Sequence, residues 1–458
     1  MNSELISRFR HQKRDLGGRT APAPPMPPTP VAFEDLGVGE PVVDKLILKH
    51  LLSAGSLRTD ELARRLGIPL SLMEAPVSFL RREALLEGRG ERNGGGIGAL
   101  LHLNLTDQGR ARAHEYAGEN AYCGPIPVPL KQYVSQVLAQ SVRRQTADRE
   151  RARQVFNGLV VRDEVVEKIG AAFNSGGSLF LYGPPGTGKT FLAGQMVRLL
   201  SGDVAIPHAV EIQGQIVEVF DPATHQRTDD QSAAEALSPD SNDGGLIRDL
   251  NGRMDQRWVK CRRPVVVAGG ELMPEMLDLV YQPNTGFYEA PLQMKANGGI
   301  FIIDDLGRQA VDPTLFLNRW IMPLENGIDY LSLHTGAKFR IPFDVLPVFA
   351  TNIEPDSLLD EAFLRRLGYK VEIDYLTEEE FAKIFAQYCE ANALPYDQEM
   401  VEYLVREHYR LNNRPMAACH PRDLINKAID YCLYQGRPLE LTAELLDKAW
   451  SSYFVTRS

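Results

Sequence analysis

The chain has 458 residues, which is too many for a single hydrophobic core and predicts about three domains. Its 44% hydrophobic and 24% charged residues are typical of an ordinary globular protein. The net charge of −10 excludes a global basic field that would hold nucleic acid or an anionic membrane. The N-terminus lacks an apolar signal segment, and no apolar run approaches the ~18 residues of a membrane span. We therefore expect a cytoplasmic protein with no transmembrane segment.

The cysteines are scattered and contain no C-x-x-C pair. This spacing indicates separate thiols in a reducing compartment, and neither a disulfide framework nor a zinc site. They are Cys123, Cys261, Cys389, Cys419 and Cys432.

Residues 1–40 are predicted to be a disordered tail. Residues 21–30 read A-P-A-P-P-M-P-P-T-P, a composition that favours extended polyproline II. We interpret this segment as a tether; the alternative is a docking peptide for a partner.

Residues 41–117 are predicted to form a winged-helix domain. Three helices come first, then two strands around a Gly-rich tip at 88–98, then a closing helix that starts near Thr106. The helices are expected over Val42–Leu52, Asp60–Leu66 and Leu70–Glu83, and the strands within Leu85–Leu105.

Binding to DNA does not follow from that order of elements. A recognition helix presents basic or amide side chains at its N-terminal end, whereas this third helix offers Glu74 and Pro76 there. We favour docking to a protein over reading DNA, which stays as the alternative.

Residues 118–155 are predicted to be a connector followed by a helix. Tyr122–Pro129 contains three prolines, which limit helix formation and favour an extended path. Leu130–Phe156 is expected to be one long helix.

The chemistry of the chain centres on one loop. Ser178–Tyr182 has the pattern of a buried strand and Phe191–Leu200 that of a helix, and the eight residues between them match G-x-x-x-x-G-K-[ST]. Such a loop wraps phosphate groups with its backbone at a helix N-terminus; Lys189 reaches the β and γ phosphates and Thr190 holds Mg²⁺. The alternative is a tight turn with no ligand. For a bound nucleotide, the segment from Phe156 to Val161 is expected to border the base. The predicted nucleotide-binding residues are Gly183, Pro184, Pro185, Gly186, Thr187, Gly188, Lys189, Thr190 and Phe191.

Residues 156–374 are predicted to be an α/β core with a β-rich insertion over about 203–298. The distance along the chain from the loop to the next catalytic strand is long for one βαβ step, which implies an inserted element. Val210–Phe220 is predicted to be a strand or hairpin arm, Thr228–Asp249 a mobile acidic excursion, and Arg263–Gly269 a buried strand.

A second signature follows at Gly299–Asp305, where an apolar strand ends in two carboxylates. Ligands bind at the carboxyl ends of strands in open α/β sheets. We expect Asp304 to position Mg²⁺ and Asp305 to orient or deprotonate the attacking water.

Further candidates lie beyond this strand. A β-hairpin is predicted over Ile328–Ile341, a strand ending at Asn352, and a short helix carrying Arg365 and Arg366. Asn352 could instead cap a turn, and the two arginines could form surface salt bridges. Residues 375–458 are predicted to form a helical lid. The aromatics of Gly286-Phe287-Tyr288 suit either a core or the grip of a ring pore on a polypeptide.

These motifs together resemble those of AAA+ ATPases over about Phe156–Phe454. The resemblance implies that Asn352 senses the γ-phosphate, that Arg366, or else Arg365, reaches into the neighbouring subunit, and that Arg422 of His420-Pro421-Arg422-Asp423-Leu424 contacts the nucleotide. The hairpin before Asn352 is similar to the pre-sensor hairpin of the MoxR and helicase-loader clades.

Three further segments resemble bacterial ATPases with chaperone activity that are associated with Flp pilus assembly. They are 122–129 (Y-C-G-P-I-P-V-P), 295–299 (K-A-N-G-G) and 303–309 (I-D-D-L-G-R-Q). One position departs from the AAA+ pattern, because most members have Glu where Asp305 stands. The shorter side chain predicts slow hydrolysis, since a misplacement of about 1 Å can cost ~100-fold in rate.

The sequence thus predicts an α/β AAA+ ATPase with an N-terminal winged helix and a C-terminal helical lid. The resemblance implies MgATP hydrolysis at the subunit interfaces of a homo-oligomeric ring, a hexamer, that remodels a protein client. Two alternatives stay open: a DNA-directed motor or regulator, and a nucleotide-gated switch with little turnover.

Overall fold

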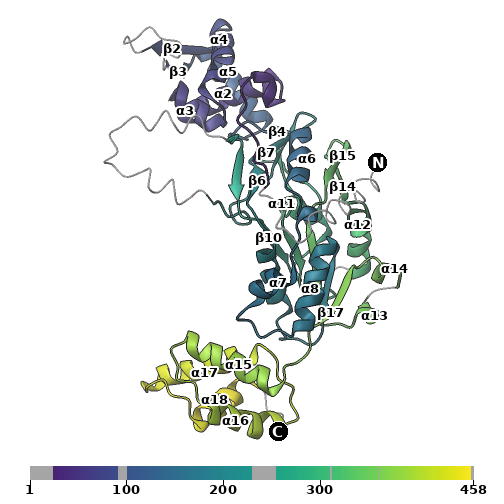
Figure 1. The fold of residues 1–458 in the computed structure, drawn as a ribbon. Helices are drawn as coiled ribbons and strands as arrows, with labels where there is room; N and C mark the ends of the chain where they lie inside the picture. Colours follow the sequence, from purple (N-terminus) through teal and green to yellow (C-terminus); the bar gives the residue numbers. More distant parts are fainter. Residues whose placement is uncertain (1–23, 91–100, 229–253, 310–311, 359–360, 455–458) are drawn as a thin grey trace.

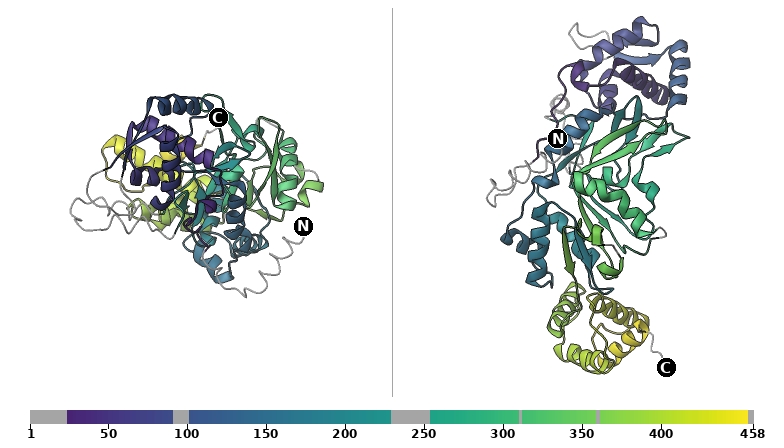
Figure 2. Two further views of the ribbon diagram at one scale, coloured as in Figure 1. Left: turned by 90° about the horizontal axis from the view of Figure 1, so that it is seen from above. Right: turned by 90° about the vertical axis from the view of Figure 1, so that its right-hand side faces the viewer.

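The computed structural model describes residues 24–90, 101–228, 254–309, 312–358 and 361–454. They form an elongated molecule, with an N-terminal module at one end, a helical lid at the other, and two β-sheets between them (Figures 1 and 2). Among these residues, no helix is both long and apolar enough to cross a membrane.

The core is a five-stranded parallel sheet in the order β10-β13-β16-β5-β17. These strands are β5 (Leu179–Tyr182), β10 (Val265–Ala268), β13 (Ile300–Ile303), β16 (Leu346–Ala350) and β17 (Tyr369–Glu372). β13 and β16 are buried along their whole length, which explains their continuous apolar runs.

Alternating side chains of these strands supply two separate hydrophobic layers. Leu179 and Leu181 face α7 (Arg149–Phe156), α8 (Asp163–Ser175), α9 (Lys189–Gln195) and η4 (Met196–Leu199). Phe180 and its neighbours pack instead with α12 (Pro313–Asn326), whose Trp320 lies against Phe301, Phe343 and Phe349. Helices thus cover both faces and leave the carboxyl ends of the strands for a site.

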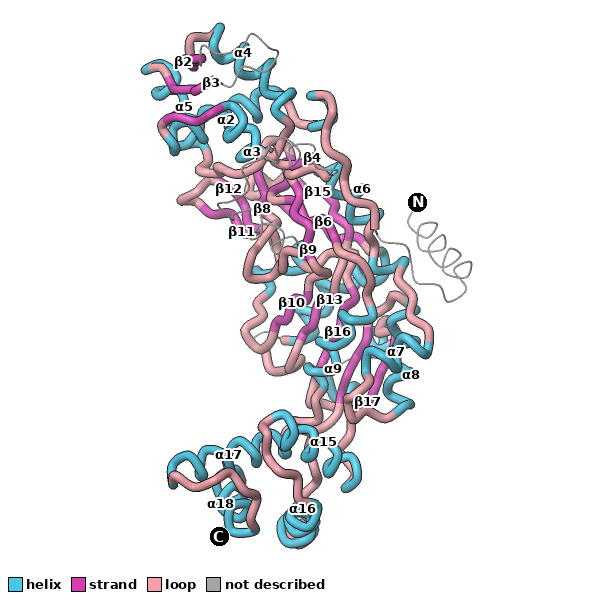
Figure 3. The backbone as a smooth tube through the Cα atoms, turned by 60° about the vertical axis from the view of Figure 1, so that its left-hand side comes forward, coloured by secondary structure: helices cyan, strands magenta, loops and turns pink. Residues whose placement is uncertain are grey.

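A second five-stranded sheet, in the order β11-β12-β8-β7-β4, lies between the core and the N-terminal module (Figure 3). Its strands are β4 (Val128–Pro129), β7 (Ala209–Ile212), β8 (Gln215–Glu218), β11 (Val280–Gln282) and β12 (Phe287–Glu289). The predicted hairpin arm at 210–220 is the pair β7–β8. β6 (Val204–Pro207) and β9 (Trp258–Cys261) pair beside it, and the predicted excursion at 228–249 lies almost wholly outside the described residues.

The predicted single insertion over 203–298 needs correction. β10 pairs with β13 and belongs to the core sheet, so the inserted strands come from two segments, one before and one after β10. β10 is also an edge strand with Val267 53% exposed, and is therefore less buried than its apolar sequence suggested.

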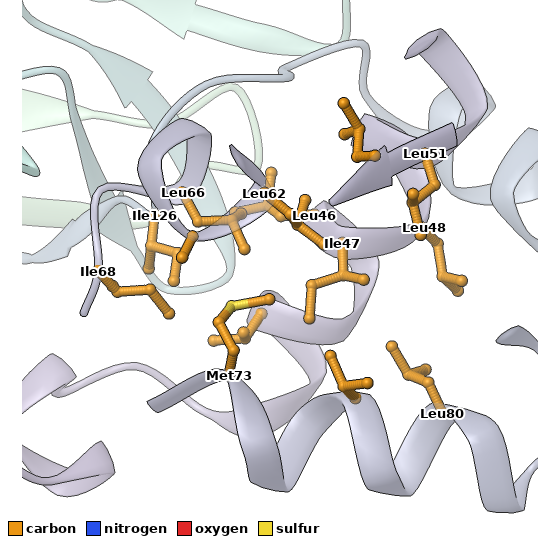
Figure 4. Close-up of a cluster of buried hydrophobic side chains, with 14 of the residues drawn as sticks. Leu46, Ile47, Leu48, Leu51, Leu62, Leu66, Ile68, Met73, Leu80 and Ile126 are labelled. Carbon is orange, nitrogen blue, oxygen red and sulfur yellow. The ribbon is translucent and has the colours of Figure 1, made fainter. Parts of the chain in front are cut away.

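The N-terminal module contains α2 (Glu40–Ala54), α3 (Thr59–Leu66), η2 (Leu70–Met73), α4 (Glu74–Arg82) and α5 (Asp107–Glu119). Its antiparallel sheet has the order β1-β3-β2, from β1 (Ser56–Arg58), β2 (Leu86–Gly90) and β3 (Leu101–Leu105). The helices bury a leucine-rich core to which Ile126 of the connector adds a side chain (Figure 4). Most of the predicted Gly-rich tip lies outside the described residues.

The predicted disordered tail is wrong for residues 24–40. Main-chain oxygens of Pro25 and Pro27 accept hydrogen bonds from the Gln136 side chain and the Asp255 amide, and Leu36 is fully buried. η1 (Phe33–Leu36) ends beside the buried pair Arg257–Asp255, and Arg257 donates to the Leu36 oxygen. Extended proline-rich chain can pack when its carbonyls find donors. Residues 1–23 lie outside the described residues.

The predicted long helix over 130–156 is also wrong, because it breaks into α6 (Leu130–Ala139), η3 (Val142–Arg144) and α7. The break centres on Asp344, a buried carboxylate that accepts from the Ser141 hydroxyl at 2.6 Å and the Val142 amide at 3.0 Å. Asp148 then caps α7 through the Arg151 amide. The buried acid thus takes one backbone donor, the Val142 amide, that a continuous helix would have used.

The predicted hairpin is present as β14 (Ile328–Ser332) and β15 (Lys338–Pro342). The single short helix expected to carry Arg365 and Arg366 is instead α13 (Pro355–Leu358) and α14 (Glu361–Leu364), and both arginines follow α14 in a turn. The helix predicted over 191–200 is α9, which continues as the 3-10 helix η4. The C-terminal helices are α15 (Glu378–Ala391), α16 (Gln398–Leu404), the π-helical turn η8 (Val405–Arg410), α17 (His420–Gln435) and α18 (Ala443–Tyr453).

Candidate nucleotide site

The phosphate-loop motif lies between β5 and α9, at the carboxyl edge of the core sheet. Gly183, Gly186 and Gly188 have φ of 130°, 74° and 90°, which a residue with a side chain adopts only under strain. A Cβ on Gly183 would lie 2.4 Å from the Ile373 oxygen after β17. The glycines therefore meet both a conformational and a spatial need.

Lys189, the first residue of α9, is only 6% exposed. Its ammonium donates to the main-chain oxygens of Gly183 at 2.9 Å and Pro184 at 2.7 Å. Burial lowers the pKa of Lys189, while the nearby Asp304 and Asp305 act to raise it. The loop thus folds around a buried positive charge.

The two carboxylates stand at the end of β13, next to the loop. The Thr190 hydroxyl donates to Asp304 Oδ2 at 2.8 Å, so a hydroxyl oxygen and a carboxylate oxygen lie side by side next to the loop. Asp305 has φ of 48°, a left-handed conformation, and its amide donates to Asp304 Oδ1 at 3.0 Å. This turn presents both acids from one strand end.

Asn352 follows β16 and joins the same group, because its Nδ2 donates to Asp305 Oδ1 at 2.8 Å. The alternative of a turn cap fits its neighbour better: Thr351 Oγ1 accepts from the Ile353 amide at 3.1 Å. The predicted loop, both predicted acids and the predicted amide are therefore assembled from three strands that lie apart in sequence.

A cavity of about 610 Å³ extends from the phosphate loop to the lid. Phe191, which is 55% exposed, and Arg422 both line it, as does the predicted base-bordering segment at Leu159–Val161. Arg422 Nε donates to Asp423 at 2.8 Å, so the arginine faces the cavity while it is held by its neighbour. The lid adds residues that the sequence did not single out: Ile384, Gln387, Tyr388, Ala391, Ala418 and Cys419.

Direct contacts hold the lid against the loop. The Cys419 amide donates to the Gly186 oxygen at 3.0 Å, and a Cβ on Gly186 would lie 2.6 Å from Cys419 Sγ. Arg162 makes two hydrogen bonds to Glu380, at 2.9 and 3.0 Å, beside the base-bordering segment. The capping box of Thr377 and Glu380, a recognisable sequence signal, positions that glutamate.

The two candidate finger arginines do not line this cavity. Arg366 Nε donates to Glu325 at 2.6 Å on the surface, and Arg365 is exposed. Within one chain they are therefore separate from the loop.

Of the two interpretations of Gly286–Tyr288, the structure supports the core. Tyr288 lies in β12 and is 1% exposed, and Phe287 packs edge-on against Tyr122 at 5.9 Å between ring centres. Phe287 thus packs against the hydrophobic cluster of the N-terminal module, and Tyr288 lies in the hydrophobic cluster of the second sheet.

The oxygens of Thr190 and Asp304 fit a magnesium ion, which prefers one or two protein oxygens together with phosphate and water. Within the described residues, no group of three or more His, Cys, Asp and Glu side chains could hold a metal by itself.

Comparisons with known proteins give limited results. A family model described as "Domain of unknown function (DUF8689)" matches residues 377–452, which is the lid. A comparison with curated proteins gives no match.

Among solved structures, similarity is found to RuvB of Thermotoga maritima. Its Holliday junction branch migration motor is 14% identical, with a TM-score of 0.34 over 64% of this chain and 69% of that chain. A point mutant of the same protein is 12% identical, with a TM-score of 0.35 over 68% of this chain and 72% of that chain.

Proposed function

We propose that this chain is an AAA+ ATPase that binds and hydrolyses MgATP at the carboxyl edge of its core sheet. One observation carries the proposal: Lys189, Thr190, Asp304, Asp305 and Asn352 converge from three strand ends on one cavity. A phosphate loop alone occurs in many nucleotide-binding proteins. This set also includes groups that could hold Mg²⁺ and orient the attacking water, as phosphoryl transfer requires.

The loop binds and orients the substrate. Its main-chain N–H groups and the start of α9 face the phosphates, and the Lys189 ammonium transfers from the Gly183 and Pro184 oxygens to the β and γ phosphates. Since the ammonium is already buried, it meets phosphate oxygens in a site of low polarity, where charge pairing is strong.

Mg²⁺ held by Thr190, and through water by Asp304, would neutralise charge on the transferring phosphoryl group. Asp305 orients the attacking water and accepts its proton. Asn352 holds the Asp305 carboxylate at one oxygen, which leaves the other for the water. Arg422 and the residues 159–161 enclose the nucleotide from the lid side.

The positions of the two arginines support a proposal for how several copies of the chain assemble. Because Arg366 and Arg365 lie outside the cavity of their own chain, they suit the site of a neighbour in a homo-oligomeric ring, a hexamer. Such a ring, located in the cytoplasm, would remodel a protein client, and the N-terminal module, as a winged helix, would recruit it. The resemblance to pilus-associated ATPases makes subunits of secretion or pilus machinery the first clients to test.

The experiment is ATP binding by the full chain and by Lys189→Ala. We expect about a 10- to 150-fold loss of affinity, since a charged hydrogen-bond donor to phosphate contributes roughly 1.5–3 kcal/mol. Arg340→Gln, an exposed arginine of the hairpin, is the control and should bind as the wild type does. Equal affinity in Lys189→Ala would refute the phosphate-loop assignment.

A further inference from the structure

A second cavity, of about 500 Å³, lies at the other end of the α9–η4 segment. It is formed by η4, the loop that leads to β6, and the start of β10, and it shares no lining residue with the nucleotide cavity. Three arginines line it, Arg198, Arg262 and Arg263, and we call it the arginine cavity.

Its lining carries little negative charge. Asp203 is the one acidic residue among the described lining residues, and it is within 3.3 Å of the Lys260 ammonium. The lining thus carries three arginine side chains and one acid, an excess of positive charge that favours an anion.

Arg263 is the buried member of the three, with 6% of its surface exposed. Its Nε donates to the Ser201 oxygen at 2.9 Å, and its Nη1 donates to the oxygens of Gln140 and Gly298. Its Nη2 is buried without a hydrogen-bond partner in the part of the chain that the structure describes. Burial lowers the pKa of Arg263 to about 10, so the group is still charged at neutral pH.

The other two arginines are exposed and weakly engaged. Arg198 Nη1 donates to Gln195 at 3.2 Å, a neutral partner. The Arg262 side chain makes no hydrogen bond or ion pair with any residue that the structure describes, although its amide donates to the Gln226 oxygen. The lining thus contains two exposed cations and one buried cation with an unused donor.

We propose that the arginine cavity binds a small anion that carries phosphate or carboxylate groups. Guanidinium groups pair with both through parallel hydrogen bonds. A small anion is favoured over a nucleic-acid backbone because a polymer cannot reach a side chain as buried as Arg263. Since η4 continues α9, which starts at Lys189, the bound anion would contact the far end of the helical segment that begins in the phosphate loop.

The test is calorimetric titration of full-length Lys189→Ala with pyrophosphate and, separately, with citrate. The Lys189→Ala background weakens phosphate binding at the loop, and no hydrolysis is measured, so the result does not depend on the proposed ATPase activity. The two probes separate a phosphate site from a carboxylate site.

We expect saturable binding of at least one probe, weakened about tenfold or more by Arg198→Gln with Arg262→Gln, because two charge-assisted contacts are lost. Both residues are exposed, and an unchanged thermal midpoint would show that the double variant is folded. Arg340→Gln, which keeps the cavity intact, should bind as its parent does. No saturable binding of either probe, or equal binding by the double variant, would overturn the proposal.

Discussion

Asp305 is the residue on which the rate of the proposed reaction depends most. It occupies a left-handed backbone conformation and is held by Asn352 at 2.8 Å. Its neighbour Asp304 is held separately, by Thr190. The two acids are thus fixed by different partners, which suits different roles.

Asp305→Glu tests whether the shorter carboxylate limits turnover. The added methylene brings the carboxylate about 1 Å further toward the water, so we expect several-fold faster hydrolysis with unchanged ATP affinity. Steady-state phosphate release measures it. A slower Asp305→Glu enzyme would contradict this and show that the hydrogen bond to Asn352 requires the shorter aspartate side chain.

Among single elements, the lid helix α17 depends on a buried histidine. His420 Nδ1 accepts from the Ala417 amide at 3.2 Å and lies 3.1 Å from the Tyr409 hydroxyl. Burial lowers the pKa of His420 from 6.5 to about 4. The folded lid therefore holds this ring neutral.

Stability should fall as the pH drops from about 6.5 toward 4. In that window the unfolded chain binds a proton at His420 that the folded chain does not, so acid favours unfolding. His420→Asn keeps an acceptor near the Nδ1 position and should flatten this part of the pH profile. Thermal unfolding of both full chains between pH 4.5 and 7 checks it; equal slopes would contradict the assignment.

How far the sequence predicts the fold differs from element to element. β13 and β16 were predictable because their apolar runs are buried on both sides. The loop was predictable because its positive φ angles require glycine. The break after α6 was not, since Asp344 acts across about two hundred positions of sequence. Nor was the packing of residues 24–40, which depends on donors from Gln136 and Asp255.

The same distinction holds for the site. The loop and the acids are local motifs, whereas the lid residues around Cys419 come near only through tertiary contacts. The capping box at Thr377 marked where the lid begins, but no local pattern marked which lid residues would face the cavity.

For the whole molecule, the second sheet ties the N-terminal module to the core. The Ile126 amide donates to the Leu66 oxygen, the Ala121 amide donates to the Thr285 oxygen, and Arg257 bridges to Leu36. The module is thus held at the end opposite the lid (Figure 1).

The proposed ring predicts a mixing result. Arg366→Ala should bind ATP yet not hydrolyse it, since a finger contributes on the order of 10³ or more in rate to its neighbour's site. Mixed with Lys189→Ala, it should regain part of the activity, because some interfaces pair an intact loop with an intact arginine.

Glu325→Gln, which removes only the surface partner of Arg366, is the matched control and should stay active. No recovery in mixed rings confirmed by mass would make Arg366 a surface residue, and Arg365 would then be tested in the same way.

The most direct measurement is phosphate release from MgATP by the full chain and by Asp305→Asn, with ATP binding measured on both. Asparagine cannot accept the proton of the water, so the account predicts that Asp305→Asn binds ATP like the wild type and loses hydrolysis. Equal hydrolysis by both chains, or none by the wild type with ATP bound, would contradict it.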